Sequence, residues 1–275
     1  MTQWIETYRG TVPPWQCDVT EHFTVAYYFD RIEEAEGNLA EALGLGPLPA
    51  ARGFDVRYAR ELRAGASFHV ESALTGIEAD GVRLGHRVVD SVSGAVVTWF
   101  DERYGLALTA DQRAALAGRV AEWDGPATEE RADPASTEGF IPTARGRVKP
   151  SDLDAAGCFS LSAMVHRFSN ASGQSGAALG MDTAYMQQNR RGFSTFEMTL
   201  RLTAALRVDE PYLIETGIGH LGNSSLRMIH RLVNARTGAE VGRLGQFGVN
   251  LDLDARRPAR WSEEIRAKAA GLLVS

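Results

Sequence analysis

Residues 12–44 read VPPWQCDVTEHFTVAYYFDRIEEAEGNLAEALG, and residues 148–180 read VKPSDLDAAGCFSLSAMVHRFSNASGQSGAALG. The two stretches align without a gap at an offset of 136 positions, which carries Asp18 onto Asp154. Farther along, Arg-Gly-Phe at 52–54 matches Arg-Gly-Phe at 191–193, in the same order along both halves. Because chance rarely keeps one order of matches through two halves, the sequence predicts a tandem duplication.

Each stretch predicts one long helix, over residues 24–43 in the first copy and 160–179 in the second. Apolar residues recur in both at the spacing that places them on one helix face. Thr24 and Ser160 are good N-cap residues, and a glycine follows each helix where a C-terminal stop is expected. The duplicated unit is therefore built around a helix of about five turns.

Alternating, β-branched segments follow each long helix. We expect strands at 54–63, 67–77, 82–90 and 95–106 in the first copy, and at 194–206, 212–220, 225–234 and 240–251 in the second. Shorter helices are expected at 111–123 and 262–273. One long helix followed by antiparallel strands predicts the α+β class, with a curled sheet wrapped around the helix in each copy.

The expected domain boundaries follow from the repeat. An N-terminal module spans residues 1–123, a linker rich in Pro, Ala, Glu and Thr spans 124–139, and a C-terminal module spans 140–275. Two such modules in one chain form an intramolecular pseudo-dimer, and the sequence leaves open whether this associates further into a homodimer.

Composition narrows the functional classes. The net charge of −6 and the pI of about 5.6 argue against a nucleic-acid-binding protein, which carries a basic stripe. The sequence has neither an apolar run long enough to span a membrane nor the apolar core of a signal peptide, so we expect a cytoplasmic protein. Its two cysteines, Cys17 and Cys158, fit neither a disulfide framework nor a zinc site. No metal or other cofactor is expected.

Two short motifs resemble a known superfamily. Residues 18–28, Asp-Val-Thr-Glu-His-Phe-Thr-Val-Ala-Tyr-Tyr, resemble the D-x-N-x-H-[hydrophobic]-N-x-x-x-Y signature of hotdog-fold thioesterases. Residues 152–157, Asp-Leu-Asp-Ala-Ala-Gly, resemble the D-x-D-x-x-G signature of the 4-hydroxybenzoyl-CoA thioesterase-like branch. The resemblance covers nearly the whole chain. It implies a double hotdog that hydrolyses an acyl-CoA or acyl-carrier-protein thioester.

The resemblance also implies roles for particular residues. Asp18 or Asp154 would act as nucleophile or general base, while backbone N–H groups at a helix N-terminus polarise the thioester carbonyl. His22 suits proton transfer because an unperturbed imidazole titrates near pH ~6.5. The candidate substrate-binding residues are Thr24, Tyr28, Glu34, Gly157, Ser160 and Asn170. Thr24 and Ser160 also have a purely structural interpretation as N-caps, and Glu34 as part of a solvated helix face.

The first motif departs from the signature, since Thr20 stands for Asn and Glu21 for Gly. In the second copy Cys158 stands where the first has His22, and we expect this cysteine to be buried packing. Either copy can therefore hold the working site. His86 and His230 occupy matched strand positions, which predicts an architectural role.

Two other functions remain open from the sequence. One is a hotdog dehydratase or hydratase, in which His22 with Glu34 or Asp154 would imitate the required His–carboxylate pair. The other is a non-catalytic acyl-binding relative, and the departures from the two signatures favour it. Retention of an acyl-CoA without release of thiol would distinguish the binding protein from the enzymes.

Overall fold

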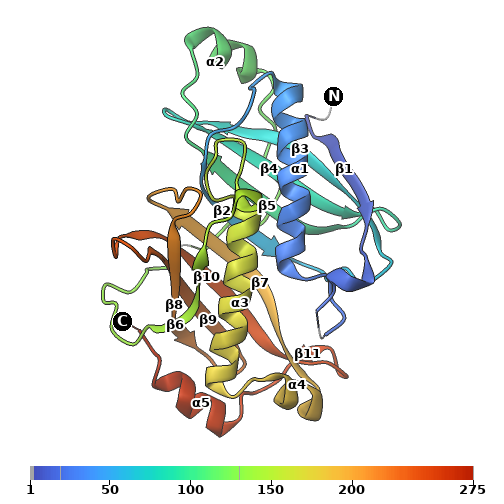
Figure 1. Ribbon diagram of the computed structural model, residues 1–275. Helices are drawn as coiled ribbons and strands as arrows, with labels where there is room; N and C mark the ends of the chain where they lie inside the picture. The colour runs from blue at the N-terminus through green and yellow to red at the C-terminus, as the bar shows by residue number, and fades with distance from the viewer. Residues whose placement is uncertain (1–2, 19, 130, 275) are drawn as a thin grey trace. The chain divides into compact units, whose positions relative to one another are not determined.

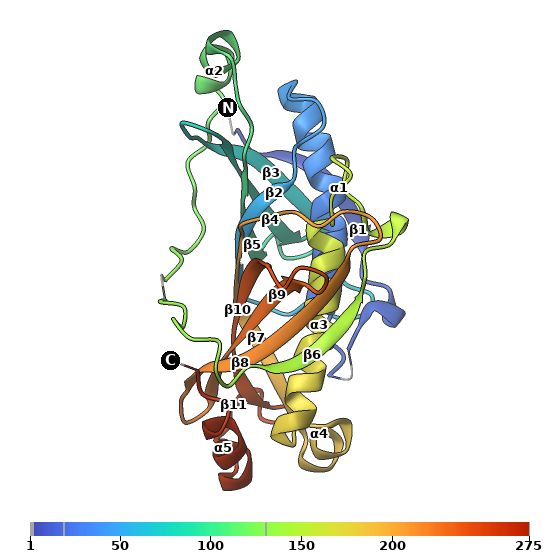
Figure 2. The same ribbon diagram turned by 60° about the vertical axis from the view of Figure 1, so that its left-hand side comes forward.

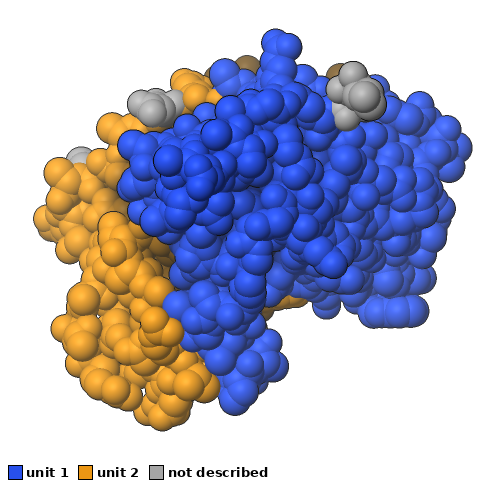
Figure 3. All heavy atoms as spheres, turned by 90° about the horizontal axis from the view of Figure 1, so that it is seen from above, with its two compact units in different colours: residues 1–127, 149–165 blue, residues 128–148, 166–275 orange. Residues whose placement is uncertain are grey.

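The computed structural model describes residues 3–18, 20–129 and 131–274. Its contacts divide the chain into two compact units (Figure 3). Unit 1 consists of Met1–Ala127 and Lys149–Val165, and unit 2 consists of Thr128–Val148 and His166–Ser275. The loop that leads into the second long helix thus belongs to unit 1. The module boundaries expected from the sequence stay a prediction.

Unit 1 contains an antiparallel sheet in the order β1-β3-β4-β5-β2 (Figure 1). Its strands are β1 Ile5–Thr11, β2 Ala51–Tyr58, β3 Ser67–Ile77, β4 Val82–Asp90 and β5 Val96–Tyr104. Its helices are α1 Val25–Leu43 and α2 Ala110–Ala117, with short 3₁₀ helices at Pro14–Gln16 and Pro150–Asp152. Helix α1 lies along one face of the curled sheet (Figure 2).

Aromatic packing fixes α1 on this sheet. Phe29, which is 1% exposed, has its ring centroid 4.6 Å from that of Phe54 on β2 and 5.1 Å from that of Phe100 on β5. The helix ends where expected, because Gly44 adopts a φ of 70°, a left-handed conformation that glycine accepts without steric cost. Packing of large rings at one end and a glycine stop at the other define the length of α1.

Unit 2 repeats the plan with the sheet order β7-β10-β9-β8-β6, and a short β11 pairs with β10. Its strands are β6 Ile141–Arg147, β7 Arg191–Leu202, β8 Pro211–Leu221, β9 Ser225–Asn234, β10 Glu240–Asp252 and β11 Arg257–Pro258. Helix α3, Leu161–Leu179, starts in the residues of unit 1 and continues into unit 2, which also contains α4 Thr183–Asn189 and α5 Glu263–Ala270. The end of α3 is buried, since Leu179 packs in one cluster with Met228 and Trp261.

Matched hydrogen bonds accompany the repeat found in the sequence. The N–H of Val12 donates to the carbonyl of Ala66 at 2.9 Å, and the N–H of Val148 donates to the carbonyl of Glu210 at 3.1 Å. Val12 and Val148 are related by the offset of 136, whereas Ala66 and Glu210 are related by 144, the offset that also relates His86 to His230. The α+β class and the double hotdog fold expected from the sequence are confirmed.

The element boundaries agree in part with the expectation. Both long helices are confirmed to within one residue, and the strands at 67–77, 82–90 and 225–234 are confirmed at both ends. The helix expected over 111–123 is too long, because α2 ends at Ala117, before Gly118, and buries only Leu116. Helix α4 was not expected. Both cysteines are free, and none of the helices in the described ranges is long and apolar enough to cross a membrane.

Candidate functional site

The loop before α1 is organised by one carboxylate oxygen. Oδ1 of Asp18 accepts hydrogen bonds from the backbone N–H of Thr20 at 2.8 Å, from the Thr20 hydroxyl at 2.6 Å and from the backbone N–H of His22 at 3.2 Å. The turn also needs Glu21 at a φ of 66°, a conformation that a residue with a side chain rarely adopts. Asp18 therefore holds Thr20 and His22 in a fixed turn. Val19 of the motif lies outside the described residues.

His22 is placed between a hydroxyl and a carboxylate. It is 8% exposed, with Nδ1 2.8 Å from the Thr20 hydroxyl and Nε2 3.0 Å from Oε2 of Glu61. Since the single hydroxyl proton of Thr20 is donated to Asp18, the hydroxyl oxygen accepts from Nδ1–H, and Nε2 is directed at Glu61. The Glu61 side chain remains 30% exposed, so water can reach this His–carboxylate pair.

The segment after β2 brings Glu61 to this place. A backbone bridge joins His22 to Arg63, and the N–H of Phe23 donates to the carbonyl of Leu62 at 2.8 Å. Tyr28, expected to contact substrate, is instead 3% exposed, and its hydroxyl accepts the N–H of Leu62 at 3.4 Å. Tyr28 thus helps to fix the backbone beside Glu61.

The N-terminus of α1 follows immediately. Thr24 is the N-cap residue, but its side chain makes no capping hydrogen bond. The N–H groups of Val25 and Ala26, in the first turn, have no acceptor within the helix and carry the positive end of its dipole. This end of α1 can stabilise negative charge on an oxygen placed next to it.

The matching loop in the second copy has the same backbone conformation but different side chains. Oδ1 of Asp154 accepts the N–H groups of Ala156 and Cys158, both at 2.9 Å, and Gly157 takes the positive φ that Glu21 has in the first copy. Ala156 and Cys158 stand where the first copy has Thr20 and His22. At the offset of 144, Ala205 stands where the first copy has Glu61.

The other expected residues lie apart from the His22 site. Ser160 caps α3, its hydroxyl accepting the N–H of Ala163 at 3.2 Å, and Cys158 is buried as expected. Glu34 is exposed and pairs with Arg31 at 3.2 Å, and Asn170 is exposed.

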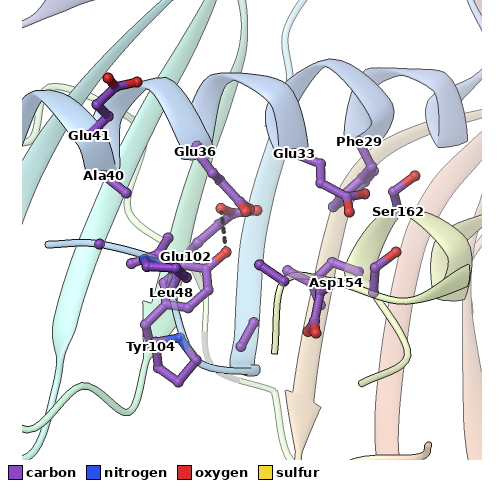
Figure 4. Close-up of a pocket in the computed structure, with 18 of the residues that line it drawn as sticks. Phe29, Glu33, Glu36, Ala40, Glu41, Leu48, Glu102, Tyr104, Asp154 and Ser162 are labelled. Atoms are coloured by element: carbon purple, nitrogen blue, oxygen red, sulfur yellow. Dashed lines mark hydrogen bonds between the residues drawn. The ribbon is translucent and has the colours of Figure 1, made fainter. Parts of the chain in front are cut away.

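Unit 1 also contains a cavity of about 710 Å³ beside the Asp154 loop. Glu33 and Glu36 of α1 reach it from one side, and Glu102 of β5 from another. Figure 4 shows Glu33 and Glu36 directed from α1 toward the side where Glu102 and Asp154 lie, whereas Glu41 points away. The remaining wall is largely apolar, with Phe29, Ala40, Pro47, Leu48, Pro49 and Ala51 among its residues.

Burial changes the ionisation of these carboxyl groups. It raises the pKa of Glu33 to about 7 and that of Glu102 to about 7, and it raises the pKa of Glu36 well above its ordinary value, with the adjacent Glu102 carboxylate adding to the effect. The Tyr104 hydroxyl donates to Oε2 of Glu102 at 3.3 Å. The cavity thus contains carboxyl groups that are partly protonated near neutral pH.

A buried polar network leads away from Glu102. Its Oε2 lies 3.4 Å from Nε2 of His86, whose Nδ1 lies 2.6 Å from the Ser72 hydroxyl, which in turn lies 2.6 Å from the Thr7 hydroxyl. Burial lowers the pKa of His86 to about 4, so His86 and Glu102 do not form an ion pair at neutral pH. The architectural position expected for His86 agrees with its complete burial.

The second copy contains the same network with neutral partners. Nδ1 of His230 lies 2.7 Å from the Thr216 hydroxyl, which lies 2.7 Å from that of Thr143. On the other side Nε2 of His230 lies 3.3 Å from the Ser172 hydroxyl and 3.4 Å from Oε1 of Gln246. Ser172 and Gln246 stand at the positions of Glu36 and Glu102 in the first copy. Unit 2 thus satisfies its histidine without carboxyl groups.

Sequence reasoning missed Glu61, Glu36 and Glu102. Glu61 lies outside the motif, and its place beside His22 depends on tertiary structure. A comparison of the two copies position by position would have singled out all three, because each aligns with a neutral residue in the second copy. Among the described residues, no group of three or more His, Cys, Asp or Glu side chains is arranged to hold a metal ion.

Comparison with known proteins relates both halves to one fold. The model of the thioesterase-like superfamily matches residues 148–269. An acyl-ACP thioesterase from Bacteroides thetaiotaomicron is 10% identical with a TM-score of 0.64, and the alignment covers 90% of this chain and 98% of that chain. The 12:0-ACP thioesterase from Umbellularia californica is 14% identical with a TM-score of 0.65, covering 90% and 94%. No curated protein matches the sequence. Residues 148–269 are thus similar to the thioesterase-like superfamily, and the chain as a whole has the fold of two hotdog modules in tandem.

Proposed function

We propose that this protein hydrolyses an acyl thioester of coenzyme A or of an acyl-carrier protein, and that the working site is the one around His22. The observation that carries the proposal is the His22 imidazole held between the Thr20 hydroxyl at 2.8 Å and the Glu61 carboxylate at 3.0 Å. An imidazole oriented by hydrogen bonds and paired with a water-accessible carboxylate is suited to activating water. The fold shared with acyl-ACP thioesterases agrees with this chemistry.

The reaction divides into two steps. In the first, the Glu61–His22 pair removes a proton from water as the water oxygen bonds to the thioester carbonyl carbon. The N–H groups of Val25 and Ala26 stabilise the oxygen that becomes negative. In the second, the carbon–sulfur bond breaks, and the proton held by the pair passes to the departing thiolate, which leaves a free acid and a thiol.

Asp18 has two possible roles, and its geometry favours positioning. One of its oxygens already accepts three hydrogen bonds within the turn and is therefore engaged in holding Thr20 and His22. The family resemblance instead implies a role for Asp18 as nucleophile or general base. Replacement by asparagine separates the two roles, because the amide oxygen still accepts hydrogen bonds but cannot attack a carbonyl.

The test measures thiol release from short, long and aromatic acyl-CoAs and from acyl-carrier proteins. We expect Glu61→Gln and His22→Gln each to lower kcat by roughly 10²–10⁴-fold, since general base catalysis contributes about that much. Asp18→Asn should cost less than about tenfold if Asp18 only positions Thr20 and His22, and far more if it is the nucleophile.

The matched control is Asp154→Asn, at the same position of the second loop. It should leave kcat unchanged, because that loop lacks counterparts of Thr20, His22 and Glu61. Loss of activity in Asp154→Asn with full activity in Glu61→Gln would reject the His22 site and place the chemistry in the second copy.

A hydratase also requires a His–carboxylate pair, so hydration of an enoyl thioester is the second candidate function. Addition of water to an enoyl-CoA, with no thiol released from any saturated thioester, would identify a hydratase. Tight acyl-CoA binding without either reaction would identify a binding protein.

A further inference from the structure

The sheet of unit 1 neutralises an arginine with an acid of its own, whereas unit 2 has the matched arginine without the acid. In unit 1 the guanidinium of Arg83 on β4 pairs with the Asp101 carboxylate on β5, and its Nε lies 3.1 Å from Oδ1. At the offset of 144, the same two positions in unit 2 are Arg227 on β9 and Gly245 on β10. Arg227 is therefore a largely buried cation, with a side chain 10% exposed, that lacks this partner on the neighbouring strand.

A second acid of unit 1 is replaced beside the first. Asp55 of β2 lies directly opposite Asp101 in the sheet register, and Thr199 of β7 lies opposite Gly245 in the same way. Asp55 and Thr199 are also related by the offset of 144. Two adjacent carboxylates of unit 1 thus correspond to a hydroxyl and a hydrogen atom in unit 2, next to Arg227.

A separate segment of unit 2 supplies negative charge to this arginine. Residues 131–134 pass on the side of the sheet away from α3 (Figure 2). Nη2 of Arg227 lies 3.0 Å from Oδ1 of Asp133, and its Nη1 donates to the carbonyl of Ala132 at 3.1 Å. The Asp133 side chain is 42% exposed, and an ion pair with so exposed a partner contributes little to stability. Another anion can therefore displace this carboxylate at a small cost.

A cavity of about 470 Å³ lies at this place. Gly245 is part of its wall and faces away from α3, because the next residue, Gln246, bonds to Ser172 of that helix. A Cβ at Gly245 would lie 3.1 Å from Nη2 of Arg227, so a carboxylate at this position would meet the guanidinium directly. The cavity thus exposes the donor that Asp101 occupies in the other copy.

The charges around the cavity favour a dianion. Its lining contains four arginines and three acids, namely Arg131, Arg201, Arg227 and Arg243 with Glu129, Asp133 and Glu197. When Asp133 is withdrawn, the arginines exceed the acids by two. The planar fork of a guanidinium matches the oxygens of a phosphate group, and the volume lies within the range of small-molecule sites.

We propose that this cavity binds the phosphate group of a small ligand, which displaces Asp133 from Arg227 and accepts its N–H donors. The site belongs to unit 2, whereas the His22 loop belongs to unit 1, and the proposal does not depend on thioester hydrolysis.

Calorimetry on the full chain with inorganic phosphate, glycerol 3-phosphate and acetate tests the proposal. All three are titrated at one ionic strength, so that screening is equal, and at a pH of about 8, where phosphate groups carry two charges. We expect phosphate to bind at least about tenfold more tightly than acetate. Equal binding of glycerol 3-phosphate would identify the phosphate group of a larger ligand, and its exclusion would identify free phosphate.

Unit 1 supplies the first test variant. Gly245→Asp installs the acid that Asp101 provides beside Arg83, so the variant is expected to fold, and thermal melting verifies this. It should weaken phosphate binding by about tenfold or more, because the new carboxylate occupies Arg227. Arg227→Gln removes the cation itself and should have the same effect.

The opposite effect is expected from the displaced residue. Asp133→Asn should tighten phosphate binding by about two- to fivefold, because it removes a competing carboxylate whose own ion pair is weak. Asp124→Asn is the matched control. It removes a charge from the same part of the chain, but Asp124 pairs with Arg87 of unit 1, so phosphate binding should not change.

The proposal is overturned if acetate binds as tightly as phosphate, or if phosphate does not bind to the wild-type chain. Unchanged phosphate binding in Gly245→Asp and Arg227→Gln would overturn it as well. An equal gain in Asp133→Asn and Asp124→Asn would have the same meaning, because it would indicate attraction to a less acidic chain rather than a site at Arg227.

Discussion

Glu102 is a buried acid whose neighbouring imidazole, His86, is neutral near pH 7, and its burial affects the stability of the protein. Its pKa of about 7 exceeds the ordinary value of 4.5 because burial disfavours the charged form. The folded state therefore binds a proton more tightly than the unfolded chain does. The resulting stability is fully present below pH 4.5 and is lost as the pH rises through about 7.

Glu102→Gln should remove this dependence. At pH 8 we expect the variant to be more stable than the wild-type chain by about 1–3 kcal/mol, because glutamine is neutral at every pH. Near pH 4.5 and below the advantage should disappear, since Glu102 is then protonated in both states. Urea unfolding of both proteins at the two pH values measures the difference, and an advantage independent of pH would contradict the expected ionisation.

Glu61 shows why the site could be predicted only in part. Asp18 and His22 were found because they belong to one short motif, and a motif can be read from local sequence. Glu61 meets His22 only after the chain has formed α1 and β2, so no local pattern reports the contact. Tyr28 was assigned to substrate from its motif position, yet burial among Phe23 and Tyr58 leaves it in the core.

Among the elements, helix α1 offers two glycines with opposite requirements. Gly44 has a φ of 70° at the C-terminus of the helix, where an L side chain is strained although space is open. Gly37 lies within the helix with a conformation that any residue adopts, and a Cβ there would touch nothing within 4 Å. Substitutions at these two positions therefore distinguish the effect of backbone strain from that of side-chain packing.

Alanine should therefore act in opposite directions at these two sites. We expect Gly44→Ala to lower the free energy of unfolding by about 1 kcal/mol through left-handed strain. Gly37→Ala should raise it by roughly 0.5–1 kcal/mol, because alanine restricts the unfolded chain and favours the helix. Urea denaturation measures both, and a stabilised Gly44→Ala variant would show that the left-handed cap is dispensable.

Helices and strands could be predicted from the sequence where the spacing of their apolar residues matches the face that they bury. Both long helices have one apolar face and end at a glycine with a positive φ, Gly44 and Gly180, and their boundaries were found to within one residue. Helix α2 was overestimated because the residues after Gly118 are helix formers by composition but leave the helix, and the N–H of the buried Ala121 donates to the carbonyl of Leu74 on β3 at 2.8 Å. Helix α4 was missed because it is short and has no buried residue, so no apolar periodicity marks it.

Both copies contribute to acid unfolding, because each buries one histidine whose pKa is lowered to about 4 by desolvation. The unfolded chain binds those protons near the ordinary value of 6.5. The stability contributed by neutral His86 and His230 is therefore present above pH 6.5 and is lost as the pH falls toward 4. In unit 1 the buried carboxyl groups, whose pKa values are raised, stabilise the folded state as the pH falls and so oppose this loss. The network around His230 in unit 2 contains no such carboxyl group.

His230→Gln tests this account. We expect the variant to lose less stability than the wild-type chain between pH 6.5 and pH 4, by roughly 1–3 kcal/mol, whatever its stability at neutral pH. The exposed His220 gives the matched control, and His220→Gln should reproduce the wild-type slope. The readout is the change of melting temperature with pH, and parallel slopes for His230→Gln and wild type would refute the assignment.

The fusion of two modules into one chain has a consequence for how the protein can change over generations. In a symmetric homodimer every substitution appears at two related places, because both subunits come from one gene. Here a substitution alters one copy alone. The first copy can therefore carry Glu61 and His22 where the second has alanine and cysteine, and carboxyl groups at positions 36 and 102 where the second has serine and glutamine. Duplication followed by covalent linkage thus allows one ancestral plan to diverge into two unequal halves.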